Sequence, residues 1–392
     1  MPDSIPDTSP KPDVSASHGV ILSAIALLCI GVVMVHSAGL SIGASGTGAP
    51  WLTIQSRPVV YALLAVAAMF TVWMLPAGWL RGFLFRIGPL TPLLMLGAVL
   101  CVYVPGLGHE EKGALRWIKA PGMELTAQPS EIAKWAIGVF VAWYAVRFSG
   151  RLRLFWKGLL PALAAIGLIA LLVAVEDLGT GVIIAATGSL LLVAGGARIT
   201  HFLMMAPIGI GALAALILTS DYRVRRIGAF ADPYADPEGS GFHIIQSLVA
   251  IAHGGPSGRG LGFGLQKFGY LPEDRTDFLF SVICEELGLI GAAGVISLYL
   301  VMLWCGYLIV RGLPDRFSAL VATGVLVTIA GQATMNLFVV TGLAPTKGIA
   351  LPLLSAGGTG WVLTGASLGL LACFAQLSKS VHDAPAHELS SA

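Results

Sequence analysis

The chain has 392 residues, of which 56% are hydrophobic and 11% are charged, with a mean hydropathy of +0.83. Soluble globular proteins carry about 25% charged residues, so this composition excludes an ordinary soluble enzyme and predicts a polytopic membrane protein. The net charge is only +2, which gives no reason to expect a nucleic-acid partner. Five cysteines lie far apart inside apolar runs, which is typical of buried side chains and not of a disulfide framework or a metal site.

The first 18 residues are rich in Pro, Ser and Asp and lack the basic start of a signal peptide, so we expect a disordered cytoplasmic tail there. A membrane-spanning helix needs about 20 mostly apolar residues. Windows of that size predict an all-α membrane domain over residues 19–377, with a second cytoplasmic tail at 378–392. Its ten predicted spans are 19–37, 58–76, 88–106, 131–147, 158–175, 178–197, 200–219, 279–310, 317–341 and 357–377.

Two of these spans have unusual features. The eighth is too long for one perpendicular helix and contains Gly288 and Gly291, so its first two turns are expected to line a cavity and not to face lipid. The fifth and sixth are separated only by Glu176-Asp177, which predicts a tight helical hairpin.

Basic residues predict the orientation. The connectors on the side of the N-terminus hold nine of them, whereas the short opposite connectors hold Arg57, the Glu176-Asp177 pair and Lys347. The positive-inside rule then places both termini in the cytoplasm. The nine are Arg81, Arg86, Arg147, Arg151, Arg153, Lys157, Arg198, Arg311 and Arg316.

A long polar region, residues 220–278, then lies outside the membrane between the seventh and eighth spans, and function is the usual reason for such a loop. Its glycines could let backbone amides approach a ligand, or the loop could simply be flexible. Arg259, Lys267 and Arg275 could contact a pyrophosphate. Asp277 lies where the chain re-enters the membrane, where partial desolvation would raise its pKa and suit proton transfer. It could also be the N-cap of the eighth span, and the two roles are not exclusive.

The other outer polar groups have structural alternatives too. Arg116-Trp117 could be an interfacial anchor, and Asp177 could cap the hairpin. Ser130 could be a helix N-cap, with Glu131 and Lys134 paired at i,i+3, and composition alone favours this alternative.

Two charged groups at the membrane are costly unless they are paired or solvated. Lys347 lies at the mouth of a span, and Glu285-Glu286 lies inside the eighth. The glutamates are functional candidates, unless an Arg or Lys of a neighbouring helix neutralises them.

Between residues 113 and 371 an ordered set of motifs resembles the SEDS family (shape, elongation, division and sporulation), the membrane peptidoglycan polymerases typified by RodA and FtsW. Each motif is weak alone, but their joint order is specific, and Pro345-Thr346-Lys347-Gly348 resembles the FtsW branch more than RodA. The motifs are Arg116-Trp117-Ile118, Gln128-Pro129-Ser130-Glu131-Ile132-Ala133-Lys134, Asp177-Leu178-Gly179-Thr180, Asp236-Pro237-Glu238-Gly239-Ser240-Gly241, Ile244-Ile245-Gln246-Ser247-Leu248, Gln266-Lys267, Tyr270-Leu271-Pro272-Glu273, Thr276-Asp277-Phe278 and Glu285-Glu286-Leu287-Gly288.

The resemblance implies an inverting glycosyltransferase that polymerises lipid II at the outer face of the bacterial cytoplasmic (inner) membrane. The growing glycan on undecaprenyl pyrophosphate is the donor, and the 4-hydroxyl of the next lipid II is the acceptor. It also implies a class B penicillin-binding protein as partner, within a division or elongation complex. A divalent cation, Mg or Mn, would suit the pyrophosphate leaving group, although the sequence contains no cluster of metal ligands.

On this template Asp277 matches the proposed general base. The other residues that we expect to contact substrate are Arg116, Trp117, Gln128, Ser130, Glu131, Lys134, Asp177, Gln246, Arg259, Gln266, Lys267, Glu273, Arg275, Thr276, Lys347 and Ser355.

The chain also departs from the family pattern. Arg275 stands where the family usually has His, and its permanent charge should lower the pKa of Asp277 and could strengthen a pyrophosphate contact. Glu176 and the run 356–360 differ as well, which indicates a diverged branch. Two alternatives therefore remain: a lipid II flippase, and a non-catalytic scaffold of a division complex.

Overall fold

The computed structural model describes residues 14–39, 57–105, 107–111, 114–119, 126–268 and 270–382. Most of the two predicted tails lies outside these ranges. The parts that are described are helical, since the first helix already begins at Val14 and the last continues to His382.

The described chain is mostly helical. A π-helical turn, η4 (Phe155–Leu159), and three 3-10 turns, η2 (Gly88–Leu90), η3 (Cys101–Tyr103) and η5 (Pro233–Ala235), join or extend the helices. The α-helices are α1 (Val14–Ala38), α2 (Arg57–Trp73), α3 (Ala77–Ile87), α4 (Thr91–Leu100), α5 (Pro129–Arg147), α6 (Leu160–Glu176), α7 (Leu178–Ala194), α8 (Ile199–Leu218), α9 (Asp221–Ala231), α10 (Phe242–Gly254), α11 (Leu279–Gly312), α12 (Arg316–Val340) and α13 (Thr359–His382).

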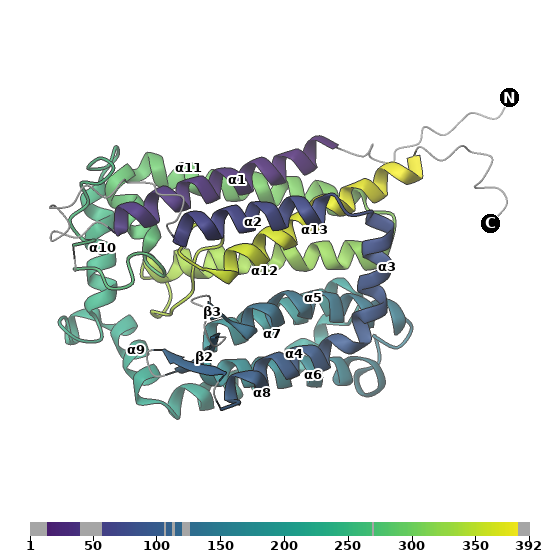
Figure 1. Ribbon diagram of the computed structural model, residues 1–392. Helices are drawn as coiled ribbons and strands as arrows, with labels where there is room; N and C mark the ends of the chain where they lie inside the picture. Colours follow the sequence, from purple (N-terminus) through teal and green to yellow (C-terminus); the bar gives the residue numbers. More distant parts are fainter. Residues whose placement is uncertain are drawn as a thin grey trace.

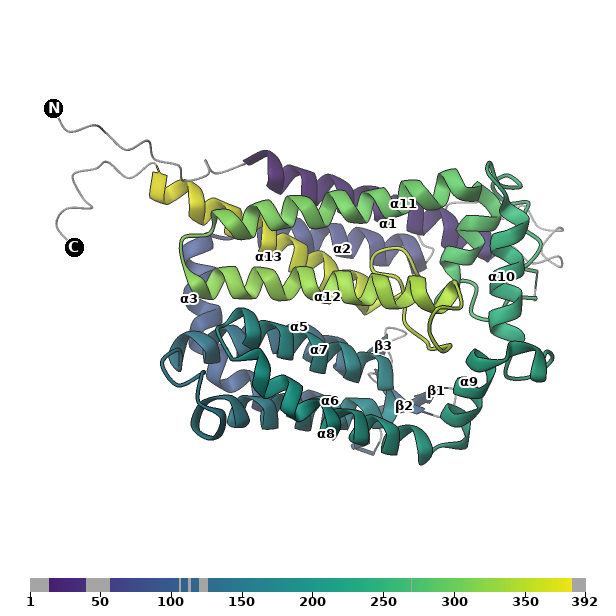
Figure 2. The ribbon, with the colours of Figure 1, turned by 180° about the vertical axis from the view of Figure 1, so that it is seen from behind.

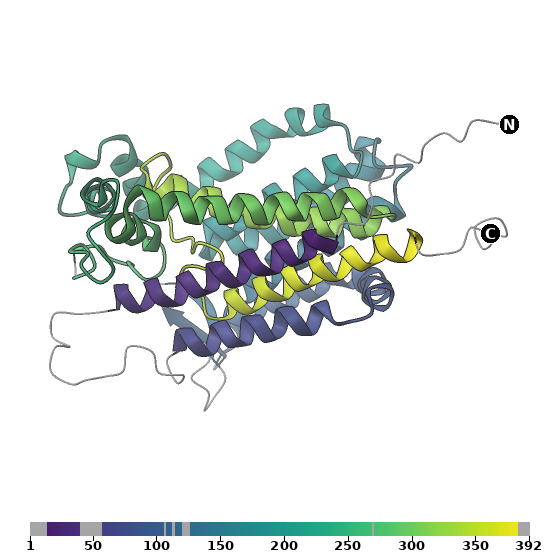
Figure 3. The ribbon, with the colours of Figure 1, turned by 90° about the horizontal axis from the view of Figure 1, so that it is seen from above.

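Most of these helices run along one direction in two groups (Figure 1). One group holds α1, α2, α11, α12 and α13, and the other holds α4 to α8; α12 joins them by packing against α5 and α7. At one end α3 crosses between the groups, and at the other end α9 and α10 do so (Figure 2). From above, α1 lies between α11 and α13, with α2 beyond α13 (Figure 3). The start of α1 and the end of α13 lie at the same end of the bundle.

Seven helical stretches of the described chain are long and apolar enough to cross a membrane. They give the protein the character of a multi-pass membrane protein, as its composition predicts. Two more of the predicted spans, α2 and α7, are apolar helices of 17 residues each.

The prediction of an all-α fold is wrong in one region. Residues 108–127 contain a three-stranded antiparallel sheet of β1 (Gly108–Glu111), β2 (Ala114–Lys119) and β3 (Thr126–Ala127), in the order β1-β2-β3. In its register His109 faces Trp117, and Ile118 faces Ala127. These strands are short, so windows of span length could not detect them.

Windows of span length also missed shorter helices in two regions that were predicted to be loops. The predicted connector at 77–87 is helix α3, which contains Arg81 and Arg86 and crosses the end of the bundle (Figure 1). The polar region 220–278 is not one long loop, because it contains α9, η5 and α10.

Helix α11 is broken at Gly288, where φ is +66° and ψ is −163°, a conformation that glycine alone adopts easily. Residues 279–286 are buried, and backbone amides of the 254–264 segment donate to carbonyls of this first part, such as that from Arg259 to Glu285. The first turns of α11 are therefore covered by the 254–264 segment.

Candidate active site

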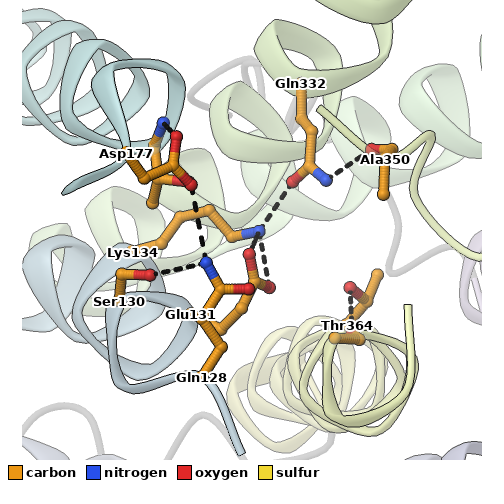
Figure 4. A network of polar contacts seen from close by, with 10 residues as sticks. Gln128, Ser130, Glu131, Lys134, Asp177, Gln332, Ala350 and Thr364 are labelled. Carbon is orange, nitrogen blue, oxygen red and sulfur yellow. Dashed lines mark hydrogen bonds and ion pairs between the residues drawn. The ribbon is translucent and has the colours of Figure 1, made fainter. Parts of the chain in front are cut away.

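A buried lysine near the start of α5 organises a polar network (Figure 4). The Lys134 amine donates to both Glu131 carboxylate oxygens at 2.7 Å and to Gln332 Oε1 of α12 at 2.7 Å. Lys134 is 2% exposed, so its ammonium group is desolvated and requires these partners. The predicted i,i+3 pair is confirmed, and it links α5 to α12.

Gln128 joins this network to the α6–α7 hairpin. Its amide donates to Ser130 Oγ at 3.0 Å and lies 3.5 Å from Asp177 Oδ2. The prediction that Ser130 is the N-cap is wrong. The N-cap is Gln128, because Pro129 occupies the first helical position, where its missing N–H is not needed.

Asp177 is the N-cap of α7. Its Oδ1 accepts from the amides of Gly179 and Thr180 at 3.0 and 3.2 Å, and its Oδ2 accepts from Thr180 Oγ1 at 2.7 Å. These bonds satisfy free amides at the helix start, so the hairpin-capping alternative is confirmed. The preceding Glu176 accepts from the amide of Leu115, which holds β2 beside the hairpin.

A small pocket opens at this junction. It is lined in part by Tyr103, Arg116, Ser130, Glu176 and Asp177 and measures about 20 Å³. That is room for about one water molecule, so in this conformation the pocket does not hold a sugar. It does bring together three predicted site residues from β2, α5 and the hairpin.

Lys347 lies beside Asp177, on the segment between α12 and α13, and a Cβ atom on Gly179 would lie 3.1 Å from Lys347 Cε. Burial lowers the pKa of Lys347 to about 7; Asp177 opposes this, while the positive charges of Arg223, Arg226 and Arg116 reinforce it. The amine is therefore close to losing its proton near neutral pH. An anion bound at this group of cations would restore the charge.

The two α9 arginines in this group are functional candidates that sequence reasoning did not identify. Arg223 donates to Val175 O at 2.5 Å and to Leu216 O at 2.8 Å, and Arg226 donates to Thr346 O at 3.0 Å. Their spacing of three residues puts both on one face of a helix. That signal was hidden because residues 220–278 were predicted to be a loop.

Asp277 is partly buried in the turn before α11. It is not the N-cap, which is Phe278, so that alternative is wrong. A Cβ atom on Gly348 would lie 2.9 Å from Asp277 Oδ2, so the carboxylate rests against the residue that follows Lys347. Asn336 of α12 donates from Nδ2 to Asp277 O and to Ile349 O, both at 2.7 Å. Asn336 is a third residue that sequence reasoning did not identify.

The residues just before Asp277 form a strained turn. Glu273 has φ of +58°, and its carboxylate accepts from Thr276 Oγ1 at 3.0 Å. The Arg275 guanidinium is exposed and donates to Gly39 O at 3.1 Å, near the end of α1. Burial raises the pKa of the adjacent Asp274 to about 6, while Arg275 opposes that shift. The Arg275 guanidinium thus contacts the residue that follows α1, while its carbonyl accepts from the amide of Ala356 at 2.9 Å.

The Lys267 side chain is fully buried in an internal ion pair. Its amine lies 2.7 Å from Glu286 Oε1 and donates to Ser37 Oγ at 3.1 Å. Glu285 accepts from the amide of Gln266 at 3.2 Å and lies 3.6 Å from Arg259. The two buried glutamates therefore have basic partners, which the segment 259–267 supplies and not a neighbouring helix. Helix α1 contributes the Ser37 hydroxyl, which donates to Glu286. Arg259 and Lys267 would have to leave these contacts to meet a pyrophosphate.

Replacing Lys267 by methionine should lower the free energy of unfolding by about 3–5 kcal/mol, because Glu286 would remain buried without its counter-charge. Chemical unfolding of the purified protein in detergent measures this. The double variant Lys267→Met/Glu286→Gln should recover much of the loss. A single variant as stable as wild type would show that the pair does not hold this segment.

Three remaining predicted residues have no hydrogen bond to this site within the described ranges. Ser355 is 1% exposed and its hydroxyl accepts from the amide of Leu351 at 3.0 Å, which is a turn-forming contact. Gln246 lies half-buried on α10, and Trp117 lies half-buried on β2.

The described residues contain no group of three or more His, Cys, Asp and Glu side chains that could hold a metal ion.

Comparisons with known proteins agree with this architecture. A probable peptidoglycan glycosyltransferase FtsW of Nitrosococcus halophilus is 38% identical over 368 residues, covering 93% of this chain and 92% of the relative. The stage V sporulation protein E of Bacillus subtilis is 36% identical over 353 residues, covering 90% and 94%.

Among solved structures, a chain from a peptidoglycan synthase complex that coordinates polymerization and crosslinking superposes with a TM-score of 0.69 at 26% identity, covering 92% of this chain and 98% of that one. The rod shape determining protein RodA of Thermus thermophilus has the same fold, with a TM-score of 0.60 at 22% identity over 91% and 96% of the two chains. The family model for FtsW, RodA and SpoVE, described as cell cycle protein, matches residues 18–380. The chain therefore belongs to the FtsW/RodA/SpoVE family.

Proposed function

We propose that this chain is a glycosyltransferase that polymerises lipid II into peptidoglycan strands at the outer face of the bacterial cytoplasmic membrane. The observation that carries the proposal is the approach of Asp277 to Gly348, next to Lys347 and its neighbouring arginines. A carboxylate and a group of cations are the two elements that glycosyl transfer from a pyrophosphate requires. The names of the family members compared above are consistent with this activity.

In the proposed reaction Asp277 accepts the proton of the acceptor 4-hydroxyl. The hydroxyl oxygen then forms a bond to the anomeric carbon of the growing glycan, from the face opposite the leaving group. The bond between that carbon and the pyrophosphate oxygen breaks, and the electron pair leaves with undecaprenyl pyrophosphate. The anomeric configuration is inverted.

The leaving group carries the negative charge that develops, so cations are needed where it departs. Lys347, Arg116, Arg223 and Arg226 would supply them. Arg223 and Arg226 already donate to backbone carbonyls, which holds their guanidinium groups in fixed positions. Fixed donors need no reorganisation during the reaction. A divalent cation, if one takes part, would arrive mainly on the pyrophosphate.

The membrane arrangement belongs to the same proposal. Ten spans, with both termini in the cytoplasm, would put Asp277, Lys347 and α9 on the outer side, where lipid II is polymerised. The partner would be a class B penicillin-binding protein of a division or elongation complex, which crosslinks the new strands.

Replacing Gly348 by alanine should reduce glycan synthesis at least about tenfold while leaving the fold intact, because the new methyl group would displace the Asp277 carboxylate. A gel assay of glycan length measures the rate. Gly331→Ala on α12 is the matched control, since a Cβ atom there meets nothing within 4 Å. Equal rates for Gly348→Ala and wild type would contradict the placement of the carboxylate.

One assay separates the polymerase from a flippase. Purified protein is reconstituted into vesicles with fluorescent lipid II, and both glycan product and movement of label across the bilayer are measured. We expect glycan without accelerated movement. Accelerated movement without glycan would replace the proposal by a transport function.

A further inference from the structure

Two amide side chains follow one another on one face of α12. Gln332 and Asn336 are four residues apart, so they lie one above the other. Gln332 donates to Ala350 O and Asn336 donates to Ile349 O, both at 2.7 Å. Two consecutive carbonyls just after Gly348 are therefore held from two consecutive turns of one helix.

Asn336 makes a second contact of the same kind. Its Nδ2 also donates to Asp277 O at 2.7 Å, so both of its N–H groups are used on backbone carbonyls. These two acceptors determine the orientation of the amide, because an oxygen in that place would face two other oxygens. The opposite atom, Oδ1, is buried without a hydrogen-bond partner in the described chain, and Asn336 is 1% exposed. A buried acceptor without a partner costs free energy. The two donated bonds must offset this cost, which indicates that they stabilise this arrangement.

We propose that Asn336 is a positioning residue, which connects the backbone of Asp277 to that of Ile349. It thereby fixes the position of the Asp277 carboxylate relative to the Lys347 amine. The catalytic part of this inference depends on the proposed glycosyltransferase function, whereas the connection itself does not. Gln332 cannot replace Asn336, because it contacts only the 350 carbonyl and the Lys134 network.

Replacing Asn336 by leucine removes both donors at similar side-chain size. The segment that carries Lys347 would lose its attachment to the turn of Asp277 at Ile349, keeping the more distant bond from the Ala356 amide to Arg275 O, and water would reach the amine. Because burial is the main cause that lowers the pKa of Lys347 to about 7, release should raise that pKa toward its ordinary value of 10.5.

The first measurement needs no substrate. The purified protein is exposed to an amine acylating reagent at a series of pH values, and modification of Lys347 is followed by mass spectrometry. The rate follows the neutral fraction of the amine, so its midpoint should lie near pH 7 in wild type and at least about one unit higher in Asn336→Leu. Thr328→Val is the matched control: this buried α12 hydroxyl donates to Gly324 O of its own helix, and its removal should leave the midpoint unchanged.

The second measurement is turnover. In Asn336→Leu, kcat for glycan synthesis should fall at least about tenfold with little change in KM, as expected when reacting groups are misplaced but substrate still binds. Asn336→Thr, whose hydroxyl can donate to only one carbonyl, should be intermediate in both measurements. It also provides the test if the leucine variant does not fold.

An unchanged Lys347 midpoint together with unchanged kcat in a folded Asn336 variant would overturn the inference. Failure of the proposed function has a different signature, since a wild-type protein with no polymerase activity would still show the midpoint and its shift.

Discussion

Asp277→Asn is expected to reduce the rate of glycan synthesis by about 10²- to 10⁴-fold, the usual contribution of a general base. The amide has the size of the carboxylate but cannot accept the acceptor's proton. The backbone contact from Asn336 to Asp277 O does not involve the side chain and should survive, so the protein should remain folded. The measurement is polymerisation of lipid II by purified wild type and variant at equal concentration.

The matched control is Glu238→Gln, which neutralises an exposed carboxylate elsewhere in the 220–278 region. It should polymerise lipid II at the wild-type rate. If Asp277→Asn were as active as Glu238→Gln, the assignment of the base would be wrong, and another group would have to accept the proton. If both were inactive, the region would depend on its overall charge and not on one carboxylate.

The second large effect is a pH dependence due to Lys347. Its pKa is lowered to about 7, so the free protein carries the charged amine below this pH and the neutral amine above it. Since the charged form attracts the pyrophosphate, kcat/KM for lipid II should fall as pH rises through 7. In Lys347→Arg the fall should be absent, because a guanidinium stays protonated over this range. Lys347→Met should have low kcat/KM at every pH.

The stability of the fold should depend on pH in the direction opposite to that of kcat/KM. Between about pH 7 and the ordinary lysine pKa of 10.5, the unfolded chain binds a proton that the folded protein does not. By linkage, resistance to unfolding should therefore rise with pH in this window, while kcat/KM falls. A parallel loss of both quantities would mean that unfolding, and not deprotonation of Lys347, limits activity.

The helical membrane core was predictable because span-length apolar runs are a strong local signal. The α6–α7 hairpin and the Glu131–Lys134 pair were predictable for the same reason, since both depend on neighbours in the sequence. The β-sheet at 108–127 and helices α3, α9 and α10 were missed, because they are shorter than a span or carry charges.

The partners of the charged residues depend on the three-dimensional fold. Lys267 was expected at a pyrophosphate but pairs with Glu286, and Arg275 donates to Gly39, 236 residues away in the chain. Conversely, Asn336 lies in an apolar run with no motif around it, and only the fold brings it to Asp277. The cationic group around Lys347 likewise combines residues from β2, α9 and the segment after α12.

The most direct test of the account is the polymerase activity of the wild-type protein itself. Purified protein is incubated with lipid II, alone and with the proposed partner, a class B penicillin-binding protein, and glycan chains are separated by length. The account predicts chains of many disaccharides in at least the reaction that contains the partner. Lipid II recovered unchanged from both reactions, with a protein shown to be folded, would contradict it.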